Sequence, residues 1–136
     1  MQIEPYLFFD GRAEEAAEYY KRALGAEVEM LMRFKESPEP SSIPAGGEDK
    51  VMHMSLKIGG ARLMGSDGHC QGAPKFAGVS LSLTVADKAE ADRVFTALAD
   101  GGEVQLPLSE TFFSPRFGMV ADRFGVGWMV IVEPDQ

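Results

Sequence analysis

The sequence predicts an α+β protein: two tandem βαβββ modules that form a bent, barrel-like mixed sheet around a central hollow. Three observations support this prediction. Residues 79–85 alternate strictly between apolar and hydroxyl side chains, which is typical of a half-buried strand. The predicted order of strand, helix and three strands occurs twice in 136 residues. Apolar positions of the two halves also correspond, and matched element order across both halves indicates an internal repeat.

The first half has alternating segments on either side of a helical one. Its predicted elements are a strand over residues 3–9, a helix over 12–24, and strands over 27–34, 51–58 and 61–64. The helix has an apolar stripe, acidic residues first and basic residues last, and Gly25 ends it. In the strand after it, Glu29 and Met30 are expected on opposite faces. Residues 36–49 predict a long loop, either a mobile lid or a disordered tip.

The second half repeats this order after a glycine-rich connection. Its predicted elements are a strand over residues 79–85, a helix over 87–98, and strands over 103–108, 117–122 and 127–132. Asp87 is a candidate helix cap, with Glu90 at the capping-box position. We therefore expect a single domain over residues 1–136. Its first module spans about 1–68, the linker about 69–77 and the second module about 78–136.

Each module should cover one sheet face with its helix and leave the other face bare, toward the hollow. Strand parity then predicts which side chains line the bare faces. A pocket with apolar walls and a few polar groups suits a small molecule. The predicted ligand-binding residues are Glu4, Tyr6, Phe8, His53, Ser55, Met64, Ser80, Ser82 and Met129.

Composition narrows the choice of partners. The formal net charge of −8 argues against nucleic-acid binding, which needs a basic surface. The single cysteine, Cys70, permits no internal disulfide and fits a reducing compartment. The sequence shows neither a signal-peptide pattern nor an apolar run long enough to span a membrane. We therefore expect a cytoplasmic protein that binds neither nucleic acid nor membrane.

Four stretches resemble the PhnB-like (3-demethylubiquinone-methyltransferase-like) branch of the vicinal-oxygen-chelate superfamily. This superfamily includes glyoxalase I, bleomycin-resistance proteins and extradiol dioxygenases. The stretches are residues 5–11 with Ala16, Tyr20 and Lys21; 51–53 with 56–59; 63–64 with 66–67; and 122–126 with Trp128. The resemblance covers essentially the whole chain and implies the glyoxalase/bleomycin-resistance/dioxygenase fold and a homodimer. It implies no particular activity.

The resemblance also implies where a metal would lie. The superfamily's typical enzyme holds one divalent ion with His, Gln or Glu side chains from the first and last strand of each module. The corresponding positions here are Glu4, Ser80, Arg62 or Met64, and Met129. Only Glu4 is a normal ligand for a hard divalent ion. We therefore predict no metal centre of the usual kind and no cofactor.

Several interpretations stay open. His53 is either a general base or replacement ligand, or a half-buried histidine that hydrogen-bonds within the sheet. Glu4 is either a site residue or a solvated carboxylate. His69, beside Cys70 in the linker, is expected to be exposed. No glycine-rich strand-to-helix turn of the Rossmann type is present, so a methyl-donor nucleotide site is not expected.

Three functions follow from these interpretations. We favour a small-molecule-binding protein without the usual metal centre, whose ligand is unknown. The alternative is a metal-dependent lyase, isomerase or dioxygenase-type enzyme with an atypical site that uses Glu4 and His53. A third possibility is a protein whose hollow is filled by its own side chains and which acts through association. The sequence does not decide whether the protein is an enzyme.

Overall fold

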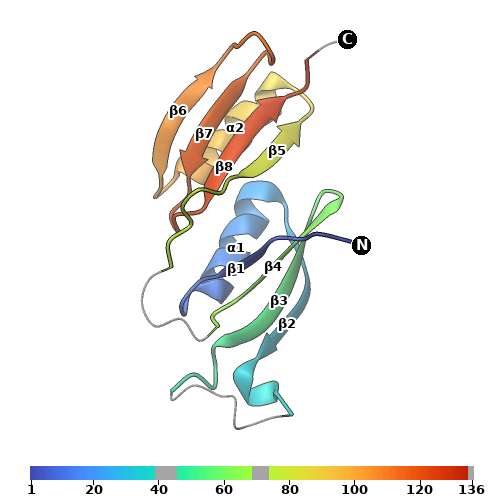
Figure 1. Ribbon diagram of the computed structural model, residues 1–136, viewed down its shortest axis with the longest axis vertical. Helices are drawn as coiled ribbons and strands as arrows, with labels where there is room; N and C mark the ends of the chain where they lie inside the picture. Colours follow the sequence, from blue (N-terminus) through green and yellow to red (C-terminus); the bar gives the residue numbers. More distant parts are fainter. Residues whose placement is uncertain (39–45, 69–73, 135–136) are drawn as a thin grey trace. The chain divides into compact units, whose positions relative to one another are not determined.

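The computed structural model describes residues 1–38, 46–68 and 74–134. The chain divides into two compact units, Met1–Pro74 and Lys75–Gln136. Each unit holds one βαβββ module, here called module 1 and module 2 (Figure 1). The element order predicted from the sequence is therefore confirmed in both modules.

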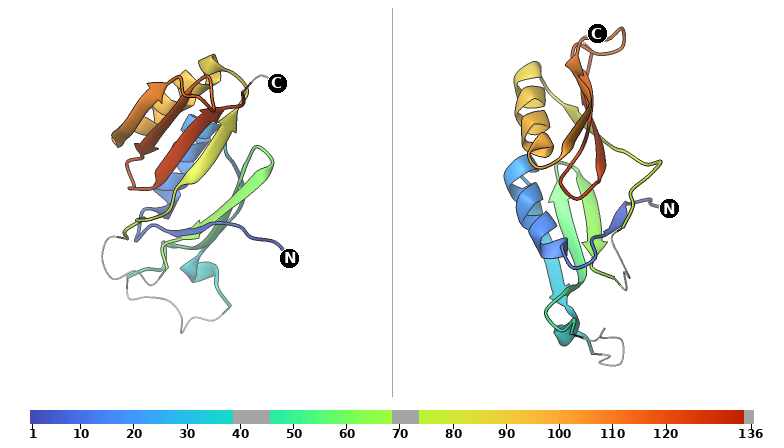
Figure 2. Two further views of the ribbon diagram at one scale, coloured as in Figure 1. Left: turned by 45° about the horizontal axis from the view of Figure 1, so that its top comes forward. Right: turned by 90° about the vertical axis from the view of Figure 1, so that its left-hand side faces the viewer.

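Module 1 is a four-stranded sheet with one helix. Its elements are β1 (Tyr6–Phe8), α1 (Ala13–Leu24), β2 (Glu27–Arg33), the short 3₁₀ helix η1 (Phe34–Glu36), β3 (Val51–Ile58) and β4 (Ala61–Ser66). The strand order is β1-β4-β3-β2, with β1 parallel to β4 and the other pairs antiparallel. Helix α1 lies on one face of this sheet (Figure 2), where Tyr20 packs against Phe9 beside the buried Met54 and Leu56.

Module 2 has the same topology. Its elements are β5 (Leu81–Val85), α2 (Lys88–Ala99), β6 (Glu103–Ser109), β7 (Phe117–Ala121) and β8 (Gly127–Val132). The strand order is β5-β8-β7-β6, again with the first pair parallel. The Asp87 side chain caps α2 by accepting a hydrogen bond of 2.8 Å from the Glu90 amide. The predicted apolar stripe of this helix is buried, namely Ala91, Val94, Phe95 and Leu98.

The strands form two separate four-stranded sheets, and neither sheet is closed. The prediction that a bent sheet surrounds a common hollow depends on how the two modules are placed against each other. It stays a prediction. The predicted single-domain boundaries stay predictions in the same way.

Some strand ends differ from the sequence-based expectation. Strand β1 begins at Tyr6 rather than at residue 3, because Ile3 lies in solvent; the Pro5 carbonyl accepts a hydrogen bond from Met64 in β4. Strand β5 begins at Leu81 because Val79 is likewise exposed. Phe34 is buried in η1 instead of continuing β2. Strand β4 is longer than expected and runs to Ser66.

Each module has a β-bulge at the same place in its edge strand. The pairing shifts between Val28 and Met30 in β2 and between Val104 and Leu106 in β6. The extra residue, Glu29, therefore shares a face with Met30, and its side chain reaches Arg62 on that face. The expectation that Glu29 and Met30 face opposite sides was wrong, because a bulge interrupts the two-residue alternation.

Two of the interpreted segments lie partly beyond the described structure. Of the predicted loop over 36–49, residues 39–45 lie outside the described residues. The two interpretations of this loop, a mobile lid or a disordered tip, both stay predictions. His69 and Cys70 also lie outside them. Among the described helices, none combines the length and the apolar character needed to cross a bilayer.

Candidate functional site

The uncovered face of the module 1 sheet brings together most of the residues predicted for a ligand site. In the strand register, Tyr6 lies opposite Met64, Met64 opposite Ser55, and Ser55 opposite Met30. Residues opposite one another in adjacent strands share a face, so these four form one row across the sheet. Leu7 and Leu56 are buried on the helix side, as the alternation requires. The predicted parity is therefore confirmed for β1, β3 and β4, whereas the bulge in β2 departs from it.

An aromatic cluster stands on this face. A hydrogen bond of 2.8 Å joins the Tyr6 hydroxyl to Nδ1 of His53, and the two rings are stacked with their centroids 5.5 Å apart. The Phe8 ring is tilted against Tyr6 at 5.2 Å. Tyr6 is 37% exposed and Phe8 is 47% exposed. The cluster is therefore an accessible and partly apolar surface that includes the hydrogen bond between Tyr6 and His53.

Ser55 adds a polar group to the same row. Its side chain is buried, and its hydroxyl has no hydrogen-bond partner among the described residues. Leaving a buried hydroxyl unsatisfied costs about 1–3 kcal/mol. The hydroxyl would therefore gain from a hydrogen bond to a molecule or a water that reaches it.

Glu4 lies just before β1, at one end of this face, and its side chain is largely shielded from solvent. Its side chain is 17% exposed, and Arg62 Nη1 lies 3.6 Å from its Oε2. The Arg62 Nε atom also donates a hydrogen bond of 3.3 Å to Glu29. Glu4, Glu29 and Arg62 line a depression of about 370 Å³. Sequence reasoning missed Glu29 because the bulge that turns it to this face leaves no mark in the alternation.

The predicted residues of module 2 lie on the corresponding face of their own sheet. Ser82 is opposite Met129, while Trp128 and Val130 are buried toward α2. Ser80 lies just before β5 and is exposed. It lines a depression of about 280 Å³ that also includes Gln105.

The donor set does not fit a hard divalent metal ion. Glu4 is in contact with the Arg62 guanidinium, which repels a cation, whereas His53 is bonded to Tyr6. Glu4 and His53, the two candidate ligands of module 1, are therefore each paired with a different side chain and not with each other. Across the described residues, no three His, Cys, Asp or Glu side chains gather in an arrangement that could hold a metal.

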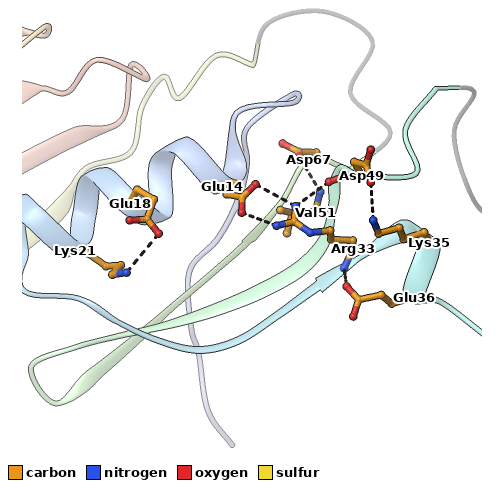
Figure 3. Close-up of polar contacts among 9 residues, drawn as sticks. All are labelled: Glu14, Glu18, Lys21, Arg33, Lys35, Glu36, Asp49, Val51 and Asp67. Atoms are coloured by element: carbon orange, nitrogen blue, oxygen red, sulfur yellow. Dashed lines mark hydrogen bonds and ion pairs between the residues drawn. The ribbon is translucent and has the colours of Figure 1, made fainter.

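Other charged clusters in module 1 are structural. Arg33 forms an ion pair with Glu14 at 2.6 Å and donates a hydrogen bond to the Asp49 carbonyl (Figure 3). Hydrogen bonding to Arg33 lowers the pKa of Glu14, and hydrogen bonding to Lys35 lowers the pKa of Asp49. These groups are largely exposed, so the pairs contribute little stability. The first pair joins α1 to the end of β2, and the second joins η1 to the segment before β3.

The matches to known proteins agree with this architecture. Residues 1–131 match the sequence model of the family described as 3-demethylubiquinone-9 3-methyltransferase. The chain belongs to this family. The chain is 34% identical over 144 residues to protein YjdN of Escherichia coli (strain K12), and the match covers 100% of this chain and 98% of YjdN. The suspected PhnB-like resemblance is therefore confirmed.

Solved structures similar to this PhnB-like chain share its fold. Protein PA1353 from Pseudomonas aeruginosa is 48% identical with a TM-score of 0.88, covering 99% of each chain. A putative 3-demethylubiquinone-9 3-methyltransferase, PhnB protein, from Bacillus cereus is 29% identical with a TM-score of 0.78, covering 97% of this chain and 99% of that one. A glyoxylase/bleomycin resistance protein/dioxygenase domain from Frankia sp. EAN1pec is 14% identical with a TM-score of 0.66, covering 99% and 93%. This last similarity is one of fold alone, and it confirms the predicted fold family.

Proposed function

We propose that this PhnB-like protein binds a small molecule with a flat, partly apolar part on the uncovered face of the module 1 sheet. The observation that carries the proposal is the half-exposed cluster of Tyr6, His53 and Phe8 on that face. The protein does so without the metal centre usual in the superfamily. Ser80, Ser82 and Met129 of module 2 remain predicted ligand contacts.

The cluster has the properties of a stacking surface. Aromatic pairs prefer offset or tilted arrangements and contribute about 0.5–1.5 kcal/mol beyond the apolar area that they bury. Tyr6 already gains part of this stabilisation from His53 and Phe8, and a ligand ring would cover the ring surface that is still exposed. Ser55 beside them supplies a hydroxyl for orienting the ligand. A pocket with mostly apolar walls and a few polar groups is the usual form of a small-molecule site.

Replacing Phe8 by alanine is expected to remove most of the ligand-induced stabilisation while leaving the fold intact, because Phe8 is half-exposed. A saturating neutral aromatic probe such as benzyl alcohol should raise the melting temperature of the unchanged protein. The rise should be much smaller in Phe8→Ala, measured from each variant's own unliganded melting temperature.

The matched control is Phe112→Ala, which removes a fully exposed phenyl ring from module 2. This variant should keep the full rise. An undiminished rise in Phe8→Ala would count against the proposed site.

The predicted homodimer also becomes a proposal. Large apolar side chains are exposed on the edge strand of each module and on one turn of module 2. They are Val28 and Met30 in β2, Val104 and Leu106 in β6, and Phe112 in the turn. Bulges in β2 and β6 and Pro107 in β6 disfavour direct strand pairing at those edges, so we expect contact through side chains. Sedimentation equilibrium at micromolar concentration should give twice the chain mass of 14.8 kDa, and the mass of a single chain would contradict the proposal.

A further inference from the structure

We propose that the ligand of module 1 is an aromatic zwitterion. Its ring would lie on Tyr6 and Phe8, and its ammonium and carboxylate groups would enter the adjoining depression at Glu4. This inference rests on the proposed function, because it names the class of molecule that the same face would take.

The depression is charged but balanced. Its lining includes the two acidic side chains Glu4 and Glu29 and the two basic side chains Lys57 and Arg62. Lys57 lies opposite Arg62 in the β3–β4 register, so both face the same side as Tyr6. A ligand with equal positive and negative charge can meet both kinds of side chain without leaving a net charge in the site. A simple cation or anion would add its own charge to this balanced set.

One carboxylate atom in this cluster lacks a hydrogen bond. Oε2 of Glu4 is buried and has no donor within hydrogen-bonding distance among the described residues. The Arg62 Nη1 atom at 3.6 Å is an ion-pair contact that is too long for a hydrogen bond. An ammonium group has three N–H donors and would satisfy this oxygen directly. The carboxylate of the same ligand would then lie toward Lys57 and Arg62.

The spacing along the chain joins the depression to the aromatic cluster. The Met64 amide donates a hydrogen bond of 3.1 Å to the Pro5 carbonyl, so the ladder of β1 and β4 continues toward Glu4. Glu4 and Tyr6 are two residues apart on one face, which corresponds to about 7 Å of extended chain. One small molecule can span this interval when a short alkyl link separates its ring from its charged groups.

The internal repeat supplies a comparison within the chain. The equivalent depression of module 2 is lined by Ser80 and Gln105 where module 1 has Glu4 and Glu29. The module 2 depression therefore presents neutral side chains at these two positions. The charged arrangement is a property of module 1, and a substitution in module 2 serves as its control.

The experiment compares four aromatic probes: phenylalanine carries both charged groups, phenethylamine only the ammonium group, 3-phenylpropionate only the carboxylate, and benzyl alcohol neither. Each is titrated into the full-length protein while the NMR signals of Tyr6, Phe8 and Arg62 are followed. Phenylalanine should bind about tenfold more tightly than either singly charged probe, as expected for an added charged hydrogen bond. In Glu4→Gln its affinity should fall to that of 3-phenylpropionate, whose own binding should be unchanged.

The control Gln105→Ala should leave the affinities for all four probes as they are in the unchanged protein. Equal affinities for phenylalanine and benzyl alcohol would overturn the zwitterion inference while leaving the proposed function standing. A loss of 3-phenylpropionate binding in Glu4→Gln would also overturn it, because Glu4 would then not be selecting the ammonium group. If none of the four probes shifts the Tyr6 or Phe8 signals, the inference and the proposed function both fail.

Discussion

Replacing Asp67 by asparagine is expected to lower the free energy of unfolding by about 2–4 kcal/mol. The Asp67 carboxylate is buried and accepts three backbone hydrogen bonds (Figure 3 shows the one from Val51). Oδ1 accepts from the Gly11 and Ala13 amides at 2.7 and 2.9 Å, and Oδ2 accepts from the Val51 amide at 2.8 Å. Asparagine keeps one acceptor oxygen and turns an NH₂ group toward an amide that needs an acceptor.

Urea unfolding followed by far-UV circular dichroism measures this effect. The matched control is Asp87→Asn at the exposed cap of α2, where asparagine is about as good a cap as aspartate. The control should cost only a few tenths of a kcal/mol. A cost for Asp67→Asn no greater than for Asp87→Asn would show that the buried carboxylate does not join α1 to β3 as described.

Replacing Gly102 by alanine is expected to cost about 3 kcal/mol. An added Cβ would overlap the carbonyl oxygen of Ala121 and lie 3.0 Å from the Asp122 Cα. Both neighbours are backbone atoms, and Ala121 pairs with Glu103 in the β6–β7 ladder. The clash is therefore relieved only by moving a strand of module 2.

The fluorescence of Trp128 reports this loss, because the chain contains a single tryptophan and it is buried in module 2. The control is Gly60→Ala in the β3–β4 hairpin, where an added Cβ meets nothing within 4 Å. That change should alter stability by less than about 0.5 kcal/mol. Equal costs for the two substitutions would contradict the close approach of backbone at Gly102.

The fold was predictable because its elements carry strong local patterns. Residues 79–85 alternate strictly, and the stripe of Ala91, Val94 and Phe95 has helical spacing. Residues 81–85 form β5 and the stripe lies in α2, as predicted. Strand ends were less predictable, since Ile3 and Val79 continue the apolar pattern but find no partner strand.

The uncovered face was predictable only where alternation holds. Tyr6, Ser55 and Met64 follow the two-residue period, and the register places them side by side. Glu29 was missed because the bulge in β2 depends on pairing with β3, which local alternation does not reveal. The bond between Tyr6 and His53 was also hidden, since it joins strands 47 positions apart in sequence. A contact between β1 and β3 can be predicted only when the order of the strands in the sheet is known. The internal repeat predicts the sequence of elements along the chain but not this order in space.

The most direct test of the proposed ligand face is a set of intermolecular nuclear Overhauser effects between benzyl alcohol and assigned side chains. The ring protons of the probe should show cross-peaks to Tyr6, Phe8 and Met64 of module 1. Cross-peaks confined to exposed rings elsewhere, such as Phe112, would contradict a binding site on this sheet.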